Sequence, residues 1–110
     1  MINQLTGRIV VDGSGDASFA AIFSGIFGLV RINPVGSVNG SSEAALTVEH
    51  EEGDIETLTE AADASSALVL WDSSNDGWRI THYKSPMIIN VSNASEGDVF
   101  MVRVVYTDDD

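Results

Sequence analysis

The sequence predicts an all-β fold: a single antiparallel β-sandwich or jelly-roll-like domain. Apolar and polar residues alternate with a period of two along most of the chain, which is typical of half-buried strands. The apolar runs are short, and clusters of Gly, Asp, Asn and Ser separate them at regular intervals. No segment has the apolar spacing of a crossover helix, which a parallel sheet would need. Together these observations predict seven to nine strands in two packed sheets.

The first half of the chain contains four expected strands. The first spans 7–11 and precedes the turn sequence DGSGD at 12–16. The uncharged run at 17–30 is shorter than the ~20 residues that cross a membrane, so we read it as two buried strands with a break at Ser24-Gly25. Asn33-Pro34 should end the second of these, because proline has no amide proton for a sheet. The fourth strand is expected at 45–49.

The second half contains four further expected strands, at 68–71, 78–83, 87–91 and 99–106. The last is the clearest, because its alternate residues from Phe100 to Tyr106 are all apolar. A tight connection at 72–77 separates the two segments that carry tryptophan. The polar segment 51–66 has two interpretations: a short strand at 55–59, or a helical turn.

Composition limits the possible functions. The 110 residues fit one domain, spanning 1–110, and 44% of them are hydrophobic, too many for a disordered acidic tail. Five basic residues against 17 acidic ones give a net charge of −12, which disfavours binding to nucleic acid and to anionic membranes. There is no cysteine, and we expect no secretory signal and no transmembrane segment. Abundant acid with Lys84 as the single lysine is typical of halophilic proteins.

The connection at 72–77 is a candidate calcium loop. Asp72, Ser74 and Asp76 place oxygen ligands at alternate positions, and Gly77 follows at the position where such loops bend sharply. The twelfth position is Tyr83 rather than the expected glutamate. The alternative is a simple turn, for which Asp, Ser, Asn and Gly are the usual residues. Residues 12–16 repeat the spacing without the glycine; we expect no other cofactor.

We expect no enzymatic activity. His50 and His82 are the only imidazole bases, and nucleophilic catalysis would need a serine held close to one of them. No serine lies in a G-x-S-x-G elbow, and Gly13-Ser14-Gly15 has neither the lysine nor the following helix of a phosphate-binding loop.

Trp71, Trp78 and Tyr83 are close in sequence and offer a different function. Exposed in a row on a sheet, they could stack on sugar rings, as in carbohydrate-binding modules of sandwich fold. The alternative is that they fill the core, where buried aromatic residues are common. We expect one tryptophan in the core and the other at an interface.

The pattern resembles small all-β structural proteins of tailed viruses, including capsid decoration proteins. The resemblance rests on the opening GRIVV at 7–11, on GLVRINP at 28–34, on MIINVSNA at 87–94, and on Gly97-Asp98-Val99 before the last strand. It implies a non-enzymatic virion protein that decorates or cements a capsid, or belongs to a turret or tail. The implied partners are copies of itself and a major capsid protein. A carbohydrate-binding or adhesin module is the alternative.

Apolar residues on both sides of several strands predict self-association. A two-layer sandwich needs one apolar face per sheet. The additional apolar residues on the other face should therefore be covered by loops or by another subunit. We expect a homo-oligomer, with a trimer favoured and with residues 17–32 in its contacts. The interface residues expected from this pattern are Phe27, Leu29 and Ile88.

Overall fold

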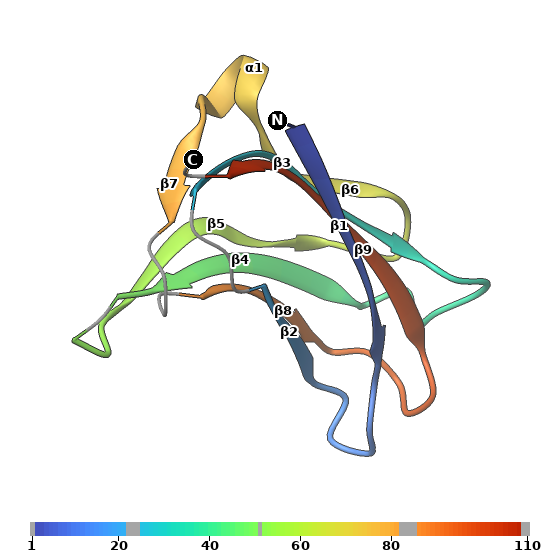
Figure 1. Cartoon of the computed structure of the whole chain (residues 1–110). Helices are drawn as coiled ribbons and strands as arrows, with labels where there is room; N and C mark the ends of the chain where they lie inside the picture. The colour runs from blue at the N-terminus through green and yellow to red at the C-terminus, as the bar shows by residue number, and fades with distance from the viewer. Residues whose placement is uncertain (1, 22–24, 51, 82–85, 109–110) are drawn as a thin grey trace.

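The computed structural model describes residues 2–21, 25–50, 52–81 and 86–108, which form two antiparallel β-sheets packed face to face (Figure 1). The described elements are β1 (Ile2–Val10), β2 (Ala17–Ala21), β3 (Gly25–Pro34), β4 (Glu43–Glu49), β5 (Ile55–Asp63), β6 (Leu68–Asp72), α1 (Ser73–Asp76), β7 (Arg79–Thr81), β8 (Met87–Ser92) and β9 (Val99–Asp108). The fold class predicted from the sequence, an all-β sandwich, is confirmed.

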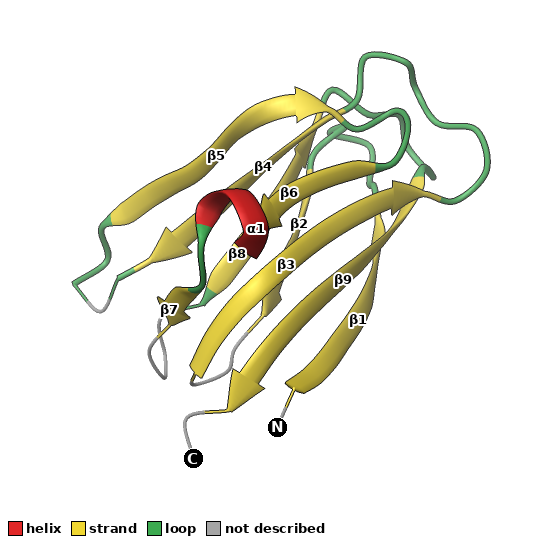
Figure 2. Cartoon of the chain, turned by 90° about the horizontal axis from the view of Figure 1, so that it is seen from above, coloured by secondary structure: helices red, strands yellow, loops and turns green. Residues whose placement is uncertain are grey.

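The strand order is that of a jelly roll. One sheet has the order β1-β9-β3-β6, with the short β7 also paired to β3; we call it the five-stranded sheet. The other, the four-stranded sheet, has the order β2-β8-β4-β5. The first two strands pair with the last two, β1 with β9 and β2 with β8, so the chain alternates between layers as jelly rolls do. Figure 2 shows β1, β9 and β3 side by side across one face.

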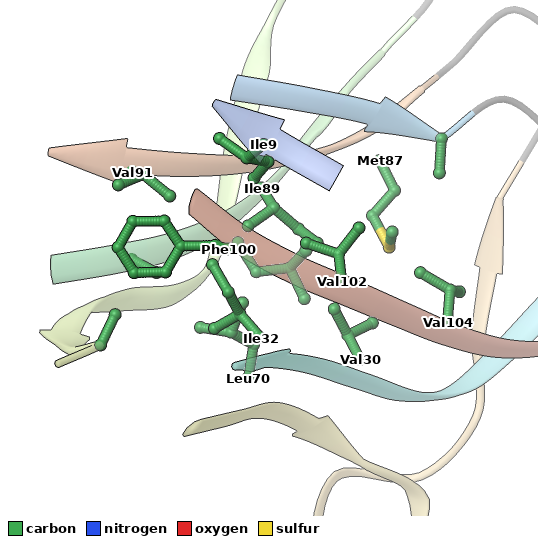
Figure 3. Packing of buried hydrophobic residues seen from close by; sticks show 14 of the residues in the cluster. Ile9, Val30, Ile32, Leu70, Met87, Ile89, Val91, Phe100, Val102 and Val104 are labelled. Atoms are coloured by element: carbon green, nitrogen blue, oxygen red, sulfur yellow. The ribbon is translucent and has the colours of Figure 1, made fainter. Parts of the chain in front are cut away.

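The core lies between the two sheets and is built by alternation along the central strands. In β9, Phe100, Val102 and Val104 are buried, and in β8, Met87, Ile89 and Val91 are buried opposite them (Figure 3). The residues between these positions point away from the core. Because the side-chain period of a strand is two, each central strand therefore has one apolar inner face and one outer face.

Most of the strands expected from the sequence are present in the structure. Strands β2 and β3 flank residues 22–24, so the break expected at Ser24-Gly25 falls between them, although Ser24 lies outside the described residues. Strand β3 ends at Pro34, as expected. Strand β1 begins at Ile2, earlier than predicted, and the 51–66 segment contains the strand alternative, extended to Asp63. The 72–77 connection contains one turn of helix, α1.

The position of Phe27 corrects the prediction that it is an interface residue. The sequence pattern placed it on the same face as Leu29, as an interface residue, but its side chain is fully buried and belongs to the core. The pairing of β3 with β9 shifts register between Phe27 and Leu29, which is the mark of a β-bulge. A shift of one residue turns the following side chains to the opposite face. Phe27 therefore shares the inner face with Val30 and Ile32.

Candidate functional site

The outer face of the five-stranded sheet carries three of the four arginines of the chain. Arg8 lies in β1, Arg103 in β9 and Arg31 in β3, and each follows or precedes a buried residue, so each side chain points away from the core. The two central pairings bring them together. Arg31 is directly opposite Arg103, and Thr6 is opposite Arg103 on the other side, which makes Arg8 a diagonal neighbour of Arg103.

This arginine cluster, Arg8, Arg31 and Arg103, lacks carboxylate partners among the described residues. No ion pair joins any of the three to an acid in that part of the chain. The Nε atom of Arg31 is buried there without a hydrogen-bond partner. Directly opposite side chains lie roughly 5 Å apart at Cβ, and like charges at that separation repel. The cluster therefore has unsatisfied capacity to bind anions.

The cluster stands out against the charge of the whole chain. Strands β1, β3 and β9 contain three arginines and one acidic residue, Asp108 at the end of β9. Three positive charges against one negative give these strands +2, so the remaining residues carry −14 to make the total of −12. The positive charge of this acidic protein is thus concentrated on one sheet.

Apolar side chains surround the arginine cluster. Val10 of β1 is 59% exposed and Val69 of β6 is 45% exposed, and Val69 is directly opposite Arg31. Half-buried Met101 and Val105 of β9 alternate with Arg103 on the same side. We call this mixed surface, Arg8, Val10, Leu29, Arg31, Val69, Met101, Arg103 and Val105, the basic face. Apolar residues around arginine are a common composition for protein interfaces.

The two remaining interface residues expected from the sequence lie on opposite sides of the sandwich. Leu29 is half-buried on the basic face, paired with Val105. Ile88 is half-buried on the outer face of the four-stranded sheet, between Ala20 and Thr47 of its neighbouring strands. One flat contact therefore cannot bury both residues of the same subunit.

The candidate calcium loop is held by the protein's own donors. Asp72 caps α1: its Oδ1 accepts hydrogen bonds from the backbone N–H of Ser74 (3.0 Å) and from its hydroxyl (2.8 Å). Oδ2 of Asp76 accepts from the backbone N–H of Asp72 at 3.1 Å. Asp72, Ser74 and Asp76 are thus brought together as a capped turn. No cluster of three or more acidic or histidine side chains suited to a metal occurs in the described residues.

The same cap recurs at two other turns. Asp12 accepts from the N–H and hydroxyl of Ser14, and Asp63 accepts from those of Ser65. Hydrogen bonds to a carboxylate favour its charged form. The side-chain bond from Ser14 and then its backbone bond lower the pKa of Asp12, and Ser65 lowers the pKa of Asp63 in the same way. For Asp72, the backbone bond from Ser74 is the larger cause of the lowered pKa.

Of the histidine and aromatic candidates, the structure describes His50, Trp71 and Trp78, and each of them has different neighbours. Nε2 of exposed His50 lies 2.9 Å from Oε1 of Glu56, while His82 and Tyr83 are outside the described residues. Trp71 packs edge-on against Phe27, and its Nε1–H donates to the carbonyl of Gly77. Trp78 is 45% exposed and lies against Gly28. Trp71 therefore has a structural role, and Trp78 is the exposed aromatic.

Sequence reasoning missed the arginine cluster. Each arginine occupies an outward position of an alternating strand, and this part could be read from the pattern. The strands are distant in sequence, however, and the pairing of β9 with both β1 and β3 could not be read from it. The useful signal was the scarcity of acid in these segments, which have Asp108 alone, in a chain of −12.

None of the helices among the described residues has the length and apolarity to cross a membrane. No family model and no curated protein matches the chain. Among solved structures, the chain is similar to the Yersinia pseudotuberculosis-derived mitogen (YPM), at 15% identity and a TM-score of 0.48. The similarity covers 100% of this chain and 89% of the mitogen.

Proposed function

We propose that the chain is a non-enzymatic structural subunit of a virion, a capsid decoration or cement protein or a turret or tail subunit, that acts by self-assembly and docking. The observation that carries the proposal is the basic face, where three arginines share one side of a sheet with two exposed valines, Val10 and Val69, and with half-buried apolar side chains. A monomer rarely leaves such apolar surface in water, so a protein partner is the best explanation for it.

The jelly-roll order supports this function without proving it, because the same architecture serves viral capsid proteins and lectins. The partners proposed are other copies of the chain and a major capsid protein, and the location proposed with them is the virion. The trimer expected from the sequence remains a separate prediction about stoichiometry.

Self-assembly is tested by sedimentation velocity over a concentration series. We expect wild-type protein to associate, and Val69→Glu on the basic face to raise the midpoint concentration at least ten-fold. Ser37→Glu is the control, because it adds the same charge at an exposed position in the loop beyond the end of β3. Wild-type protein that stays monomeric throughout would exclude the self-assembly part of the proposal.

The virion location needs its own test. Virus particles from the source culture are purified on a density gradient and probed with an antibody against this chain. We expect the chain to band with the particles. Detection only in the particle-free fractions would contradict a virion role, whatever the oligomeric state of the purified protein.

Exposed Trp78 supports a second candidate, a carbohydrate-binding or adhesin module. Its ring offers an apolar surface on which a sugar could stack. Binding to a panel of immobilised glycans that is lost in Trp78→Ala and kept in Val35→Glu would favour this function over assembly. Equal binding by both variants would exclude a role for Trp78.

A further inference from the structure

We infer that the basic face binds the outer face of the four-stranded sheet of a second copy, so that subunits join head to tail. The inference rests on the proposed self-assembly and adds the identity of the two contacting surfaces. It is argued from the charges that the strand pairings place opposite each other, one pair on each sheet.

The four-stranded sheet carries an acidic counterpart of the arginine pair. Glu43 of β4 is directly opposite Asp63 of β5. Both point outward, because Glu43 precedes buried Ala44 and Asp63 precedes buried Ala64. On the other sheet, Arg31 is directly opposite Arg103. Each pair sets like charges side by side, an arrangement that disfavours the isolated strands. Contact between the two faces would bring the pairs together and turn both repulsions into attractions.

The charged groups have binding capacity left. Oε1 of Glu43 accepts a hydrogen bond from Nδ2 of Asn93, and Oδ1 of Asp63 accepts from Ser65, but each carboxylate has about four acceptor sites in its two oxygens. On the basic face, the guanidinium of Arg31 has its buried Nε–H without an acceptor among the described residues. The three arginines of this face form no ion pair with an acid among the described residues, so their terminal nitrogens could make bidentate contacts with carboxylates of another copy.

The rest of the acidic side has a composition suited to close packing. In β2, β8 and β4, the outward residues between the strand ends are small and uncharged or apolar, among them Ala20, Ala45, Thr47 and Ile88. Exposed Glu60 lies in the neighbouring β5, and Glu49 lies at the far end of β4. A shallow hollow of about 410 Å³ lies beside the small residues of β2 and β8, lined by Asp16, Ala17, Ser18, Asn90, Val91 and Ser92. The contact would also explain how Leu29 and Ile88 can both be interface residues while lying on opposite sides of one subunit.

Electrostatics excludes the symmetric alternative. A two-fold contact uses the same patch on both subunits, so two basic faces would set arginine against arginine. Two acidic faces would likewise set Glu43 and Asp63 against their own copies. In a protein of charge −12, the basic face and the acidic face of another copy form the one attractive combination of these surfaces.

Charge reversal tests the pairing of faces. One variant combines Arg31→Glu with Arg103→Glu, and the other combines Glu43→Lys with Asp63→Lys. We expect each to remain monomeric by sedimentation velocity at concentrations where wild-type protein associates. An equimolar mixture of the two should associate again, because the unchanged acidic face of the arginine variant can bind the unchanged basic face of the other variant. The two reversed faces match each other as well.

Two other results would overturn the inference. Association of the arginine variant with wild-type protein, stronger than that of wild type with itself, would indicate a symmetric contact between basic faces. If the two variants keep the circular dichroism of wild type but stay monomeric when mixed, these faces do not pair. Either result leaves self-assembly through the basic face intact, whereas a monomeric wild type would end the proposed function itself.

Two further double variants separate the loss of the arginine contacts from loss of folding and from a general effect of net charge on association. Arg31→Gln with Arg103→Gln has a net charge of −14, two below the −12 of wild type. Ser37→Glu with Ser66→Glu has the same −14, placed at exposed loop positions outside the strands that form the two faces. We expect the first pair to weaken association at least ten-fold and the second to leave it within two-fold of wild type. Equal weakening by both would assign the effect to net charge and contradict the inference.

Discussion

At the scale of single residues, Phe27 has the clearest consequences. Its ring is fully buried and meets the ring of Trp71 edge to face, with centroids 5.7 Å apart. Because Phe27→Ala would leave a cavity in a packed core, we expect it to lower the free energy of unfolding by about 3–5 kcal/mol. Urea denaturation measures the loss. Leu29→Ala, two residues away but on the outer face, is the control and should cost much less.

Because Phe27 is buried, we expect Phe27→Asp to unfold the protein rather than to dissociate an assembly. An interface residue would let the variant dissociate with its sheets intact, as the sequence pattern predicted. A charged side chain at this buried position instead has no partner and no water, so we expect loss of the β-sheet circular dichroism. A folded, monomeric Phe27→Asp variant would restore Phe27 to the interface.

Gly7 supports a second prediction at this scale. A Cβ atom at Gly7 would lie 2.1 Å from Cε2 of Phe19, which packs across from β2. Because the ring would have to move, we expect Gly7→Ala to destabilise the protein by about 1–3 kcal/mol, as overpacked cores do. Thermal melting measures it. The combination of Gly7→Ala with Phe19→Leu should recover part of the loss, and a purely additive effect would mean that the two side chains do not clash.

At the scale of the elements, the three Asp-x-Ser caps predict a dependence of stability on pH. Asp12, Asp63 and Asp72 have a lower pKa in the folded protein than the ordinary 3.8, so the folded state binds fewer protons there than the unfolded state. Their contribution to stability is therefore complete above the ordinary pKa and is lost as pH falls through the lowered one. We expect the caps to weaken as the pH falls below the ordinary pKa of 3.8 and on through the lowered one.

Comparison of two triple variants separates the caps from the general effect of charge. Changing Asp12, Asp63 and Asp72 to Asn should flatten the fall of the melting temperature toward acid. The control changes Glu52 and Glu60 to Gln and Asp54 to Asn, which alters the net charge equally. These three side chains receive no hydrogen bonds among the described residues. Equal flattening in both variants would assign the acid response to net charge.

The turn around α1 gives a prediction about calcium. Its carboxylates already accept hydrogen bonds from Ser74 and from the Asp72 backbone, so the turn has internal support without a cation. We expect wild-type protein to melt at the same temperature in calcium and in chelator. A rise with calcium that Asp76→Asn abolishes would establish the calcium site instead.

The alternation of single strands could be predicted from the sequence, because it depends on neighbours in the chain. Strands β8 and β9 and the end of β3 at Pro34 were found in this way. The bulge at Phe27 could not be found, because it belongs to the pairing of β3 with β9, two strands far apart in sequence. For the same reason the sequence offered Leu29 and Ile88 as interface residues without showing that they lie on opposite sides.

At the scale of the whole molecule, the distribution of charge combines local and distant information. The excess of acid in the chain, and its scarcity in three strands, are visible in the sequence. The cluster exists only because the jelly-roll order puts β9 between β1 and β3. The order also puts the Arg31–Arg103 and Glu43–Asp63 pairs on different sheets, which makes the molecule polar across its thickness.

The place of the two faces decides how an assembly can grow. In a closed ring of three, the two contact faces of each subunit are inclined to each other by about 120°. The basic face and the acidic face instead lie on opposite sides of a two-layer sandwich (Figure 1). Contacts that do not close by rotation produce open arrays. We therefore expect the weight-average mass in sedimentation equilibrium to keep rising with concentration beyond three times 11.7 kDa.

The three-fold ring expected from the sequence makes a different prediction for the same experiment. A ring has no free faces, so its mass would reach a plateau at three protomers and stay there at higher concentration. Such a plateau would contradict head-to-tail stacking through opposite faces.

In an open stack, the end subunits each keep one free face, so a small amount of the Arg31→Glu, Arg103→Glu variant should terminate the stacks. That variant keeps a native acidic face, so it can bind the basic face at the end of a stack, but it has no basic face to which a further subunit could bind. The weight-average mass of the wild-type stacks should therefore fall in proportion to the amount of variant added.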